Sequence, residues 1–434
     1  MDFKLPPDLV DYLAELDRFI ATDIKPLEEA DDNIRFFDHR REWARTDFDR
    51  GGLPSREWEA LLREARRRAD AAGHLRFTLP KKYGGKEGSQ LWMAVIREYF
   101  AAMGLGLHND LQNEHSIVGN FPYVAMLMEY GTEAQQDDLI PGMCDGSRRI
   151  CFGLTEPNHG SDATWMESYA KTETRDGIPG WVINGAKMWT TGIHVGSHLA
   201  AFARTSGTRG SAKGITCFLV PIPSPGLEIG EYLWTFNMPT DHPYVYLRDC
   251  WVPASAILGQ ADNGLSLAQS FVNQNRLRQA AASLGAASYC IEESVKYARR
   301  RQPFGKSLSD NQAIQFPLVE LGTQAEMLRL LIYSTGAQMD NMCLDEVERT
   351  LSDKVSMCNY WANRLCCDAA DRAMQVHGAI GYSRHKPFEH IYRHHRRYRI
   401  TEGSEEIQMR KIAAFMFGYR GPRKSQVDEW MQGD

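Results

Sequence analysis

The sequence predicts a mainly helical protein with a β-rich domain in its middle. Apolar residues recur at helical spacing up to about residue 150. Short β-rich runs bounded by Gly or Pro fill roughly the next hundred residues, and long amphipathic segments follow from Gly264. A chain of 434 residues is long enough for two or three domains, each with its own core. We therefore place three domains at residues 1–150, 151–262 and 263–434.

The first domain is expected to be helical, because its apolar residues repeat at helical spacing and strand-like runs are few. Pro80 and Gly84–Gly85 mark a loop within it. The expected helices are Leu9–Ala21, Ser55–Ala72, Leu91–Met103 and Val124–Tyr130.

The middle domain is expected to be a small β sandwich or barrel. Trp181–Gly185 looks like a strand that ends in an Asn-Gly turn. Strands spaced this closely leave no room for helical crossovers, which argues against a parallel doubly wound sheet. The other expected strands are Leu199–Ala203, Ile215–Pro221, Leu227–Ile229 and Tyr244–Tyr246.

The last domain is expected to be a helical bundle, because its helical segments are long and amphipathic. These segments are Leu265–Arg301, Asn311–Met339, Leu344–His377 and Ile407–Phe417.

Composition narrows the functional classes. A net charge of −6 gives no reason to expect nucleic-acid binding, and no apolar run approaches the ~20 residues of an integral membrane helix. The acidic N-terminus does not look like a signal peptide, and nine cysteines without a CxxC pair indicate reduced thiols in a cytoplasmic protein.

We expect no metal site. His390 and His394 lack an evident third ligand, and an interfacial or solvated pair is commoner. The basic run Arg393–Arg399 fits a subunit interface or a CoA-phosphate surface better than a nucleic-acid patch.

Two segments around the second domain carry residues suited to a cofactor. In Cys151–Asp162, Gly160 allows close backbone approach and Thr155 and Ser161 offer hydroxyls, although a plain surface turn would look similar. In Gly185–Gly192, Trp189 could lie on a planar ring and Thr191 could bond to it. The alternative there is a half-buried strand Trp.

Two segments of the third domain allow a phosphate site or a plain helix end. In Arg300–Lys306, Arg301 could clamp a pyrophosphate as a fork, or it could complement a helix C-terminus that stops at Gly305. Gln375–Tyr382 is a helix end opening into a glycine loop, for which an ordinary C-cap is the alternative.

The segment Tyr398–Gln408 contains an acid that helix capping does not explain. Ser404 could cap the final helix, with Glu405 and Glu406 in its first turn. Glu402 precedes that cap beside Gly403, and an acid on a loop just before a helix can project into a cleft.

Together these five segments resemble, in order and spacing, the acyl-CoA dehydrogenase family. The resemblance runs from Gly131-Thr-Glu-Ala-Gln135 to Ile407-Gln408 and is strongest at Thr155-Glu-Pro-x-x-Gly-Ser-Asp162 and Arg301-x-x-Phe-Gly-Lys306. It implies an N-terminal helical domain, a middle β domain and a C-terminal four-helix bundle, with FAD as cofactor.

The resemblance also implies roles for individual residues. Trp189 and Thr191 would contact the isoalloxazine, and Arg301 and Phe304 would reach the FAD of a neighbouring subunit. Arg276 would lie near CoA and the base, with Ser161 and Gly403 also at the substrate. The remaining cofactor residues would be Phe152, Thr155, Gly160 and Ser161 at the flavin and pyrophosphate, Gln375, Gly378 and Ala379 at the adenosine, and Ser404 near the phosphates.

The implied reaction is α,β-desaturation of an acyl-CoA. Glu402 would abstract the α-proton, its basicity raised by burial, and flavin N5 would take the β-hydride to leave a trans-2-enoyl-CoA. The Glu402 N–H and a ribityl hydroxyl would bind the enolate oxygen. Electrons would pass to an electron-transferring flavoprotein from a homodimer or homotetramer. The absence of a GxGxxG after a strand gives a nicotinamide site no support.

Departures from the family pattern indicate a divergent bacterial-type branch. Asn158 and His159 replace small residues, and His159 could touch phosphate or stand in solvent. Thr235–His242 lacks the usual Gly-Ser/Thr pattern, so the acyl group stays open. The alternatives are an acyl-CoA oxidase, a nitroalkane-oxidase relative and a non-catalytic flavin-binding protein. The end of the chain soon after the base motif and Glu402 itself favour the dehydrogenase.

Overall fold

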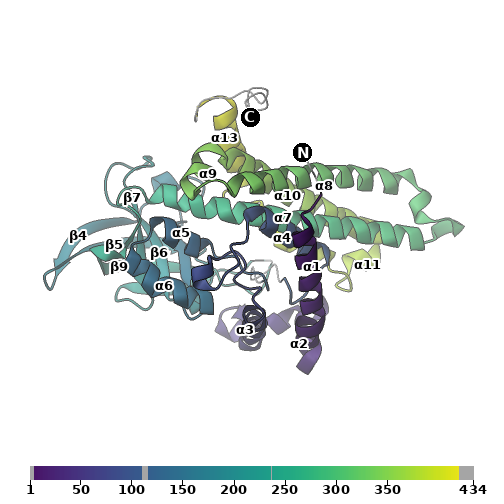
Figure 1. Cartoon of the computed structure of the whole chain (residues 1–434), viewed down its shortest axis with the longest axis horizontal. Helices are drawn as coiled ribbons and strands as arrows, with labels where there is room; N and C mark the ends of the chain where they lie inside the picture. Colours follow the sequence, from purple (N-terminus) through teal and green to yellow (C-terminus); the bar gives the residue numbers. More distant parts are fainter. Residues whose placement is uncertain (1–3, 110–115, 236, 420–434) are drawn as a thin grey trace.

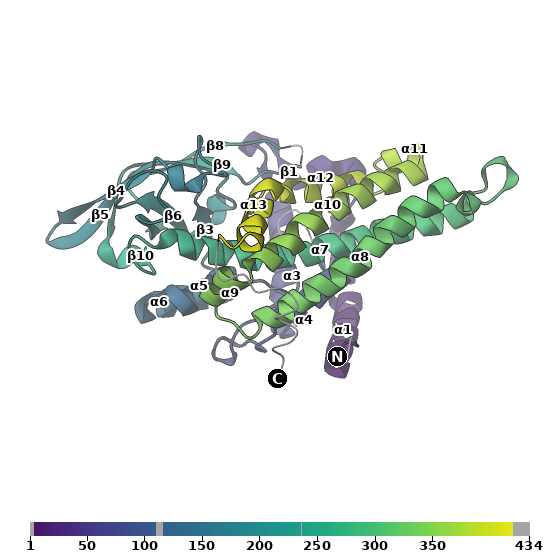
Figure 2. The same ribbon diagram turned by 90° about the horizontal axis from the view of Figure 1, so that it is seen from above.

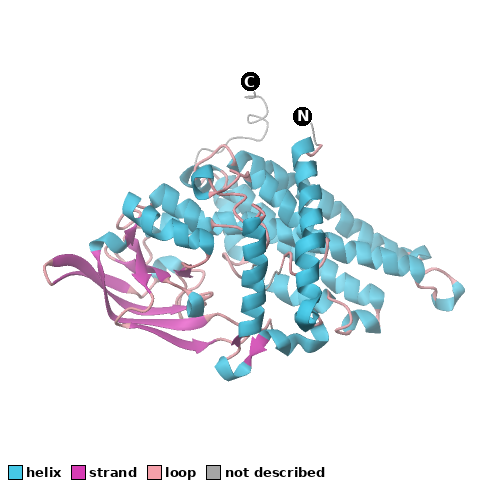
Figure 3. Cartoon of the chain, turned by 60° about the horizontal axis from the view of Figure 1, so that its bottom comes forward, coloured by secondary structure: helices cyan, strands magenta, loops and turns pink. Residues whose placement is uncertain are grey.

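The helices and the β sheet occupy opposite ends of the molecule. The computed structural model describes residues 4–109, 116–235 and 237–419. Figure 1 shows the sheet at one end, the long C-terminal helices reaching toward the other, and the N-terminal helices packed across their junction. Figure 3 shows the strands of the large sheet gathered beside the helices. The predicted order of helical, β and helical parts is therefore confirmed.

The N-terminal part contains the four helices that the sequence predicts and two that it does not, the short Lys25–Glu29 and the 13-residue Glu133–Asp145. Ser55 and Ser89 cap two of the helices by accepting hydrogen bonds from the backbone N–H of Trp58 and Trp92. The elements are α1 (Pro7–Phe19), α2 (Lys25–Glu29), β1 (Thr46–Asp47), β2 (Leu53–Pro54), α3 (Arg56–Ala71), α4 (Gln90–Ala102), α5 (Pro122–Tyr130) and α6 (Glu133–Asp145).

The middle part is one curled sheet of eight strands in the order β10-β7-β6-β4-β5-β9-β8, with β3 beside β6. Apart from the parallel pairings of β6 with β3 and β4, neighbouring strands are antiparallel. The strands are β3 (Ile150–Gly153), β4 (Tyr169–Arg175), β5 (Ile178–Met188), β6 (His198–Arg204), β7 (Ile215–Pro221), β8 (Leu227–Tyr232), β9 (Pro243–Pro253) and β10 (Ile257–Leu258).

The expected turn at Asn184-Gly185 is wrong, because β5 runs through it. The register of β5 against β9 shifts between Ile183 and Gly185, so this position is a β-bulge. A side chain on Gly185 would come within 2.7 Å of the Cα of Ser168, which explains the glycine by close approach. The tight turn lies instead between β4 and β5 at Asp176 and Gly177, both with positive φ.

The C-terminal part is built around one long buried helix. α7 (Gly264–Arg300) packs against α10 (Ser352–His377), α8 (Gln312–Met339) and α4, and α12 (Phe388–Tyr398) lies on α10 (Figure 2). The expected segment Leu344–His377 is divided at Leu351, whose φ of −128° breaks the helix. Within the described ranges, no helix is long and apolar enough to cross a bilayer. The remaining helices are α9 (Leu344–Thr350), α11 (Ala379–Tyr382) and α13 (Glu405–Met416).

The histidines of α12 are buried, so of the two expected alternatives, an interfacial or a solvated pair, the solvated one is wrong. His394 is fully buried with Nε2 3.2 Å from the Tyr398 hydroxyl, and His390 stacks on His39 with ring centroids 4.6 Å apart. Burial holds the pKa of His390 and His394 well below its usual value, so both are neutral core residues. The nine cysteines are all free and eight are buried, as expected for reduced thiols.

Candidate active site

Glu402 lies on the short loop between α12 and α13, in a strained conformation. Its φ is 57° and that of Gly403 is 83°, so two successive residues adopt the left-handed region. For a non-glycine residue this conformation costs of order 1–3 kcal/mol and persists only where tertiary contacts impose it. The side chain of Glu402 is half-buried. The loop must therefore be held from outside.

Arg276 supplies the strongest of these contacts. It is buried in the middle of α7, and its Nε and Nη2 donate to the backbone carbonyl of Glu402 at 2.9 and 2.6 Å, while Nη1 donates to the Ser356 hydroxyl at 3.2 Å. Burial lowers the pKa of Arg276 only to about 10, so the guanidinium stays charged near neutral pH. A Cβ on Gly403 would lie 3.0 Å from Nη2. Arg276 is thus beside the base, as expected, but it binds the backbone and not the carboxylate.

Buried amide side chains hold the rest of the loop. Gln408 donates to the carbonyl of Gly403 at 2.8 Å and to the side-chain oxygen of Asn359 at 3.0 Å. Asn363 donates to the carbonyl of Tyr398 at 3.2 Å. Amides from α10 and α13 therefore bind backbone on both sides of Glu402, which fixes the loop before any ligand arrives.

The carboxylate of Glu402 is itself in contact with α7. The side-chain amide of the buried Asn275 donates to its Oε1 over a long 3.4 Å. Asn275 precedes Arg276 on α7, so one helix turn contacts both the side chain and the backbone of the acid. Ser404 occupies the N-cap position of α13, but its hydroxyl makes no capping bond, so that expectation is wrong.

A buried ion pair joins the two segments proposed for the flavin. Nζ of Lys187, which is fully buried, lies 2.7 Å from Glu156, and the same carboxylate accepts the backbone N–H of Glu167 and Ser168 at 2.5 and 2.9 Å. Burial opposes the charge on Glu156, but Lys187 and these donors still hold its pKa below the usual value. The sequence offered no sign of this pairing, because the partners stand 31 residues apart.

The loop after β3 and the end of β5 consequently lie side by side. The backbone N–H of Met188 donates to the carbonyl of Thr155 at 2.9 Å. The next residue, Trp189, has a backbone φ of 63° and is 41% exposed. A strained backbone therefore holds a large indole that is partly open to solvent. Thr191 is exposed, with its hydroxyl 3.1 Å from Nδ1 of His242. An open indole beside polar hydroxyls fits a planar heterocycle.

The other residues of this loop leave room for a ligand. A Cβ on Gly160 would meet nothing within 4 Å, and Ser161 is exposed. Phe152 is half-buried and stacks on Phe271 of α7 with ring centroids 4.5 Å apart. His159 lies 2.8 Å from the carboxylate of Asp162 and belongs to an acid–base pair within its own loop.

Arg301 and Phe304 directly follow the C-terminal end of α7, the long helix that reaches away from the sheet (Figure 1). A helix rises 1.5 Å per residue, so Arg301 stands about 37 Å along α7 from Arg276. The rings of Tyr297 and His377 meet with centroids 4.3 Å apart and bring the ends of α7 and α10 together. Phe304 is fully exposed with a φ of 52°. The other expected adenosine-end residues, Gln375, Gly378 and Ala379, are also exposed at this end.

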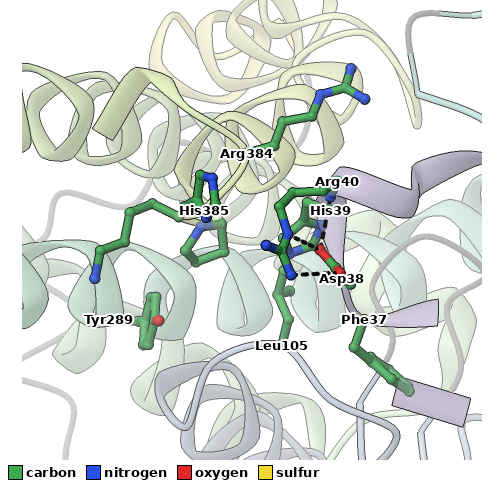
Figure 4. Close-up of a pocket in the computed structure, with 10 residues that line it drawn as sticks. Phe37, Asp38, His39, Arg40, Leu105, Tyr289, Arg384 and His385 are labelled. Carbon is green, nitrogen blue, oxygen red and sulfur yellow. Dashed lines mark hydrogen bonds and ion pairs between the residues drawn. The ribbon is translucent and has the colours of Figure 1, made fainter. Parts of the chain in front are cut away.

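A separate pocket of about 370 Å³ lies between the segment after α2 and the loop before α12. Figure 4 shows Arg40 turned onto Asp38, which it binds at 2.8 Å, and Arg384 directed away from the pocket. None of the expected site residues lines this pocket. Its lining includes His39, Arg40, Tyr289, Arg384, His385 and Lys386.

The chain matches known family models along most of its length. The models are acyl-CoA dehydrogenase N-terminal domain over residues 10–147, middle domain over 151–250 and C-terminal domain over 262–417. It is 31% identical over 300 residues to the mitochondrial short-chain specific acyl-CoA dehydrogenase of Rattus norvegicus, covering 69% of this chain and 70% of that one. It is 28% identical over 347 residues to the caffeyl-CoA reductase-Etf complex subunit CarC of Acetobacterium woodii, covering 79% and 87%.

A solved structure shares the fold. The glutaryl-CoA dehydrogenase from Mycobacterium smegmatis in complex with FADH2 aligns with a TM-score of 0.74 at 24% identity, covering 96% of each chain. The matches to all three family models, with the fold and the loop that carries Glu402, lead to one conclusion: this chain belongs to the acyl-CoA dehydrogenase family.

Proposed function

We propose that the protein is an FAD-dependent acyl-CoA dehydrogenase that converts an acyl-CoA to the trans-2-enoyl-CoA, with Glu402 as the base. The observation that carries this proposal is the strained loop of Glu402, fixed by Arg276 through its backbone while its carboxylate stays half-buried. Strain held by buried contacts is a feature of functional sites. We also propose that the three domains end at residues 150, 262 and 434, as the sequence predicts.

The residues around Trp189 are suited to hold the flavin. Trp189 would lie on the isoalloxazine, and Thr191, Thr155, Gly160 and Ser161 would border it, because the Lys187–Glu156 pair brings both segments together. When bound, FAD supplies the acceptor for the β-hydride. The Mycobacterium smegmatis glutaryl-CoA dehydrogenase was solved in complex with FADH2, which supports this cofactor.

The chain itself has to remove the α-proton. A carboxylate abstracts such a weakly acidic proton best in a site that excludes water, where its basicity rises. Arg276 and Gln408 fix the backbone on either side of that carboxylate, so Glu402 would reach the proton without reorganising. The backbone N–H of Glu402 would donate to the thioester oxygen as negative charge develops there.

Features outside the loop of Glu402 support two proposed partners, a second copy of the chain and an electron acceptor. The exposed Phe304 and Arg301 are placed to serve a second copy, which supports a homodimer or homotetramer. Exposed apolar side chains on α8, Phe316, Val319, Met327 and Leu330, offer a further surface for another subunit. The Acetobacterium woodii relative is named as a subunit of an Etf complex, which supports an electron-transferring flavoprotein as acceptor.

A second candidate is the reverse reaction, reduction of an enoyl-CoA. It is favoured by the names of two relatives, the caffeyl-CoA reductase subunit and the 3-(aryl)acrylate reductase of Clostridium sporogenes. The same groups would serve, because protonation at Cα by Glu402 reverses its abstraction. The direction would then be set by the electron partner and not by the site.

An anaerobic screen tests the proposal. The purified protein is mixed with saturated acyl-CoAs of different length, branching and polarity, and flavin absorbance is followed. Bleaching by at least one of them is the expected result. If none bleaches the flavin and an enoyl-CoA reoxidises chemically reduced protein, the reductase is the better assignment. Rapid reoxidation by oxygen after bleaching would indicate an acyl-CoA oxidase instead.

A further inference from the structure

Tyr123 is a buried phenol whose hydroxyl has no partner in the part of the chain that the structure describes. The residue is 7% exposed, and its hydroxyl oxygen is buried without a hydrogen bond. Leaving a buried hydroxyl unpaired costs roughly 1–3 kcal/mol, whereas phenylalanine would fill the same space without that cost. A tyrosine here is therefore explained only if something else bonds its hydroxyl.

Tyr123 packs against the helix that contacts Glu402. Tyr123 is in the first turn of α5, which packs on α7, and its ring centroid lies 4.8 Å from that of Phe271. Phe271 and Asn275 stand four residues apart on α7 and so share one helix face. Asn275 is the residue that donates to the carboxylate of Glu402. One aromatic ring therefore separates Tyr123 from the helix face that contacts the acid.

The surroundings of Tyr123 suit an acyl chain better than the polyanionic part of CoA. Phe271 stacks in turn on Phe152, so the phenol belongs to a group of aromatic rings. Burial, and then the neighbouring Cys151, Cys217 and Glu402, raise the pKa of Tyr123 well above its usual value. The phenol therefore stays protonated, and the nearby carboxylate would repel a second negative charge.

We propose that the hydroxyl of Tyr123 hydrogen-bonds an uncharged oxygen, a hydroxyl or a carbonyl, on the acyl chain of the substrate. This inference rests on the proposed function: Cα would lie at Glu402 and Cβ at the flavin, so the acyl atoms beyond Cβ would be the ones to meet Tyr123. A phenol both donates and accepts, so it can pair with either kind of oxygen. The substrate class is thus a hydroxyacyl- or oxoacyl-CoA and not a plain or dicarboxylic one.

The test compares substrates that differ only in their polar group. Hexanoyl-CoA, its 4-, 5- and 6-hydroxy derivatives, 5-oxohexanoyl-CoA and the dicarboxylic adipoyl-CoA are each used to reduce the flavin anaerobically in wild type and in Tyr123→Phe. We expect at least one hydroxy or oxo substrate to react with a higher kcat/KM than hexanoyl-CoA. Tyr123→Phe should lower the ratio of kcat/KM for that substrate to kcat/KM for hexanoyl-CoA by roughly 5- to 10-fold or more, since one hydrogen bond to the polar group is lost.

Tyr130→Phe is the matched control, because Tyr130 is on the same helix and its hydroxyl already lies 2.9 Å from the Ser270 hydroxyl. It should leave the substrate ratio unchanged. Tyr123→Phe should also keep or raise the thermal midpoint of the free protein, because no protein bond is removed. A fall in that midpoint would show a structural partner and overturn the inference.

The outcomes separate this inference from the function on which it rests. If no acyl-CoA bleaches the flavin, the proposed function fails. If hexanoyl-CoA reacts as well as every polar derivative, if adipoyl-CoA is preferred, or if Tyr123→Phe slows all substrates equally, the dehydrogenase stands. The role of Tyr123 in recognising a neutral oxygen is then refuted.

Discussion

At the scale of single residues, the site depends on how Glu402 is held. The sequence indicates Glu402 because Glu405 and Glu406 fall in the first turn of the final helix, whereas Glu402 stands before that helix beside Gly403. It could not indicate that Arg276 binds the Glu402 carbonyl, since a contact between a helix and a loop 126 residues away depends on the packing of the bundle. We therefore propose Arg276 as a positioning residue, which would act on the reaction through the geometry of Glu402.

Arg276→Gln tests that role. Glutamine cannot replace the fork of two N–H groups on the Glu402 carbonyl, so the loop should relax away from its strained conformation. A shift of about 1 Å in a catalytic group can lower the rate by about 10²-fold, and we expect a loss of that order in kcat. The measurement is single-turnover flavin reduction at saturating substrate, with flavin content and KM determined alongside.

The two parameters distinguish positioning from binding. A positioning role predicts a fall in kcat with flavin content unchanged and KM changed far less. A rise in KM at constant kcat would instead assign Arg276 to substrate binding, as the family resemblance first implied. Arg410→Gln, at an exposed arginine on α13, is the control and should change neither parameter.

At the scale of elements, segment types were predictable and their connections were not. Eight helical segments and five of the eight strands of the sheet follow from local sequence patterns, whereas α6, α12, β3, β4 and β10 were not predicted. The Asn184-Gly185 turn was wrong because the same two residues also suit a bulge within a strand, and only the contact with Ser168 distinguishes the two. The Glu156–Lys187 ion pair could not be predicted from the sequence either, because neither residue is unusual in its own segment.

Removing that ion pair should destabilise the β domain. Lys187→Met leaves the buried Glu156 without its counter-charge, which typically costs about 3–5 kcal/mol. We expect a lower thermal midpoint and weaker flavin retention, because the segments of Thr155 and Trp189 would separate. The double variant Glu156→Gln/Lys187→Met should recover part of the stability, since no buried charge is then left alone. A single variant as stable as wild type would contradict this account.

At the scale of the whole molecule, the order of the three domains was predictable from the sequence. Whether a single chain supplies every residue of the proposed cofactor site was not. The segments at Thr155 and Trp189 are adjacent, but Arg301 and Phe304 follow the end of α7 that points away from the sheet. Spacing along the sequence contains no information about which residues meet across subunits. The resemblance alone indicated that Arg301 serves a neighbour, and its position far from Trp189 is what such an arrangement needs.

Co-expression of two inactive variants tests whether subunits share their sites. Arg301→Ala and Glu402→Gln are each expected to lose activity alone, the first through loss of FAD. In a mixed dimer, the chain with intact Glu402 would receive Arg301 from its partner. Random pairing should then restore about a quarter of wild-type activity per dimer. No recovery in isolated mixed dimers would mean that Arg301 acts within its own chain or not at the cofactor.

The central claim is that Glu402 removes the α-proton, and the anaerobic rate of flavin reduction in Glu402→Gln measures it most directly. Glu406→Gln, an exposed acid at the start of α13, is the matched control. The account predicts that Glu402→Gln retains flavin and binds the acyl-CoA but reduces the flavin at least about 10³-fold more slowly, while Glu406→Gln reacts like wild type. Flavin reduction at the wild-type rate in Glu402→Gln would contradict the account.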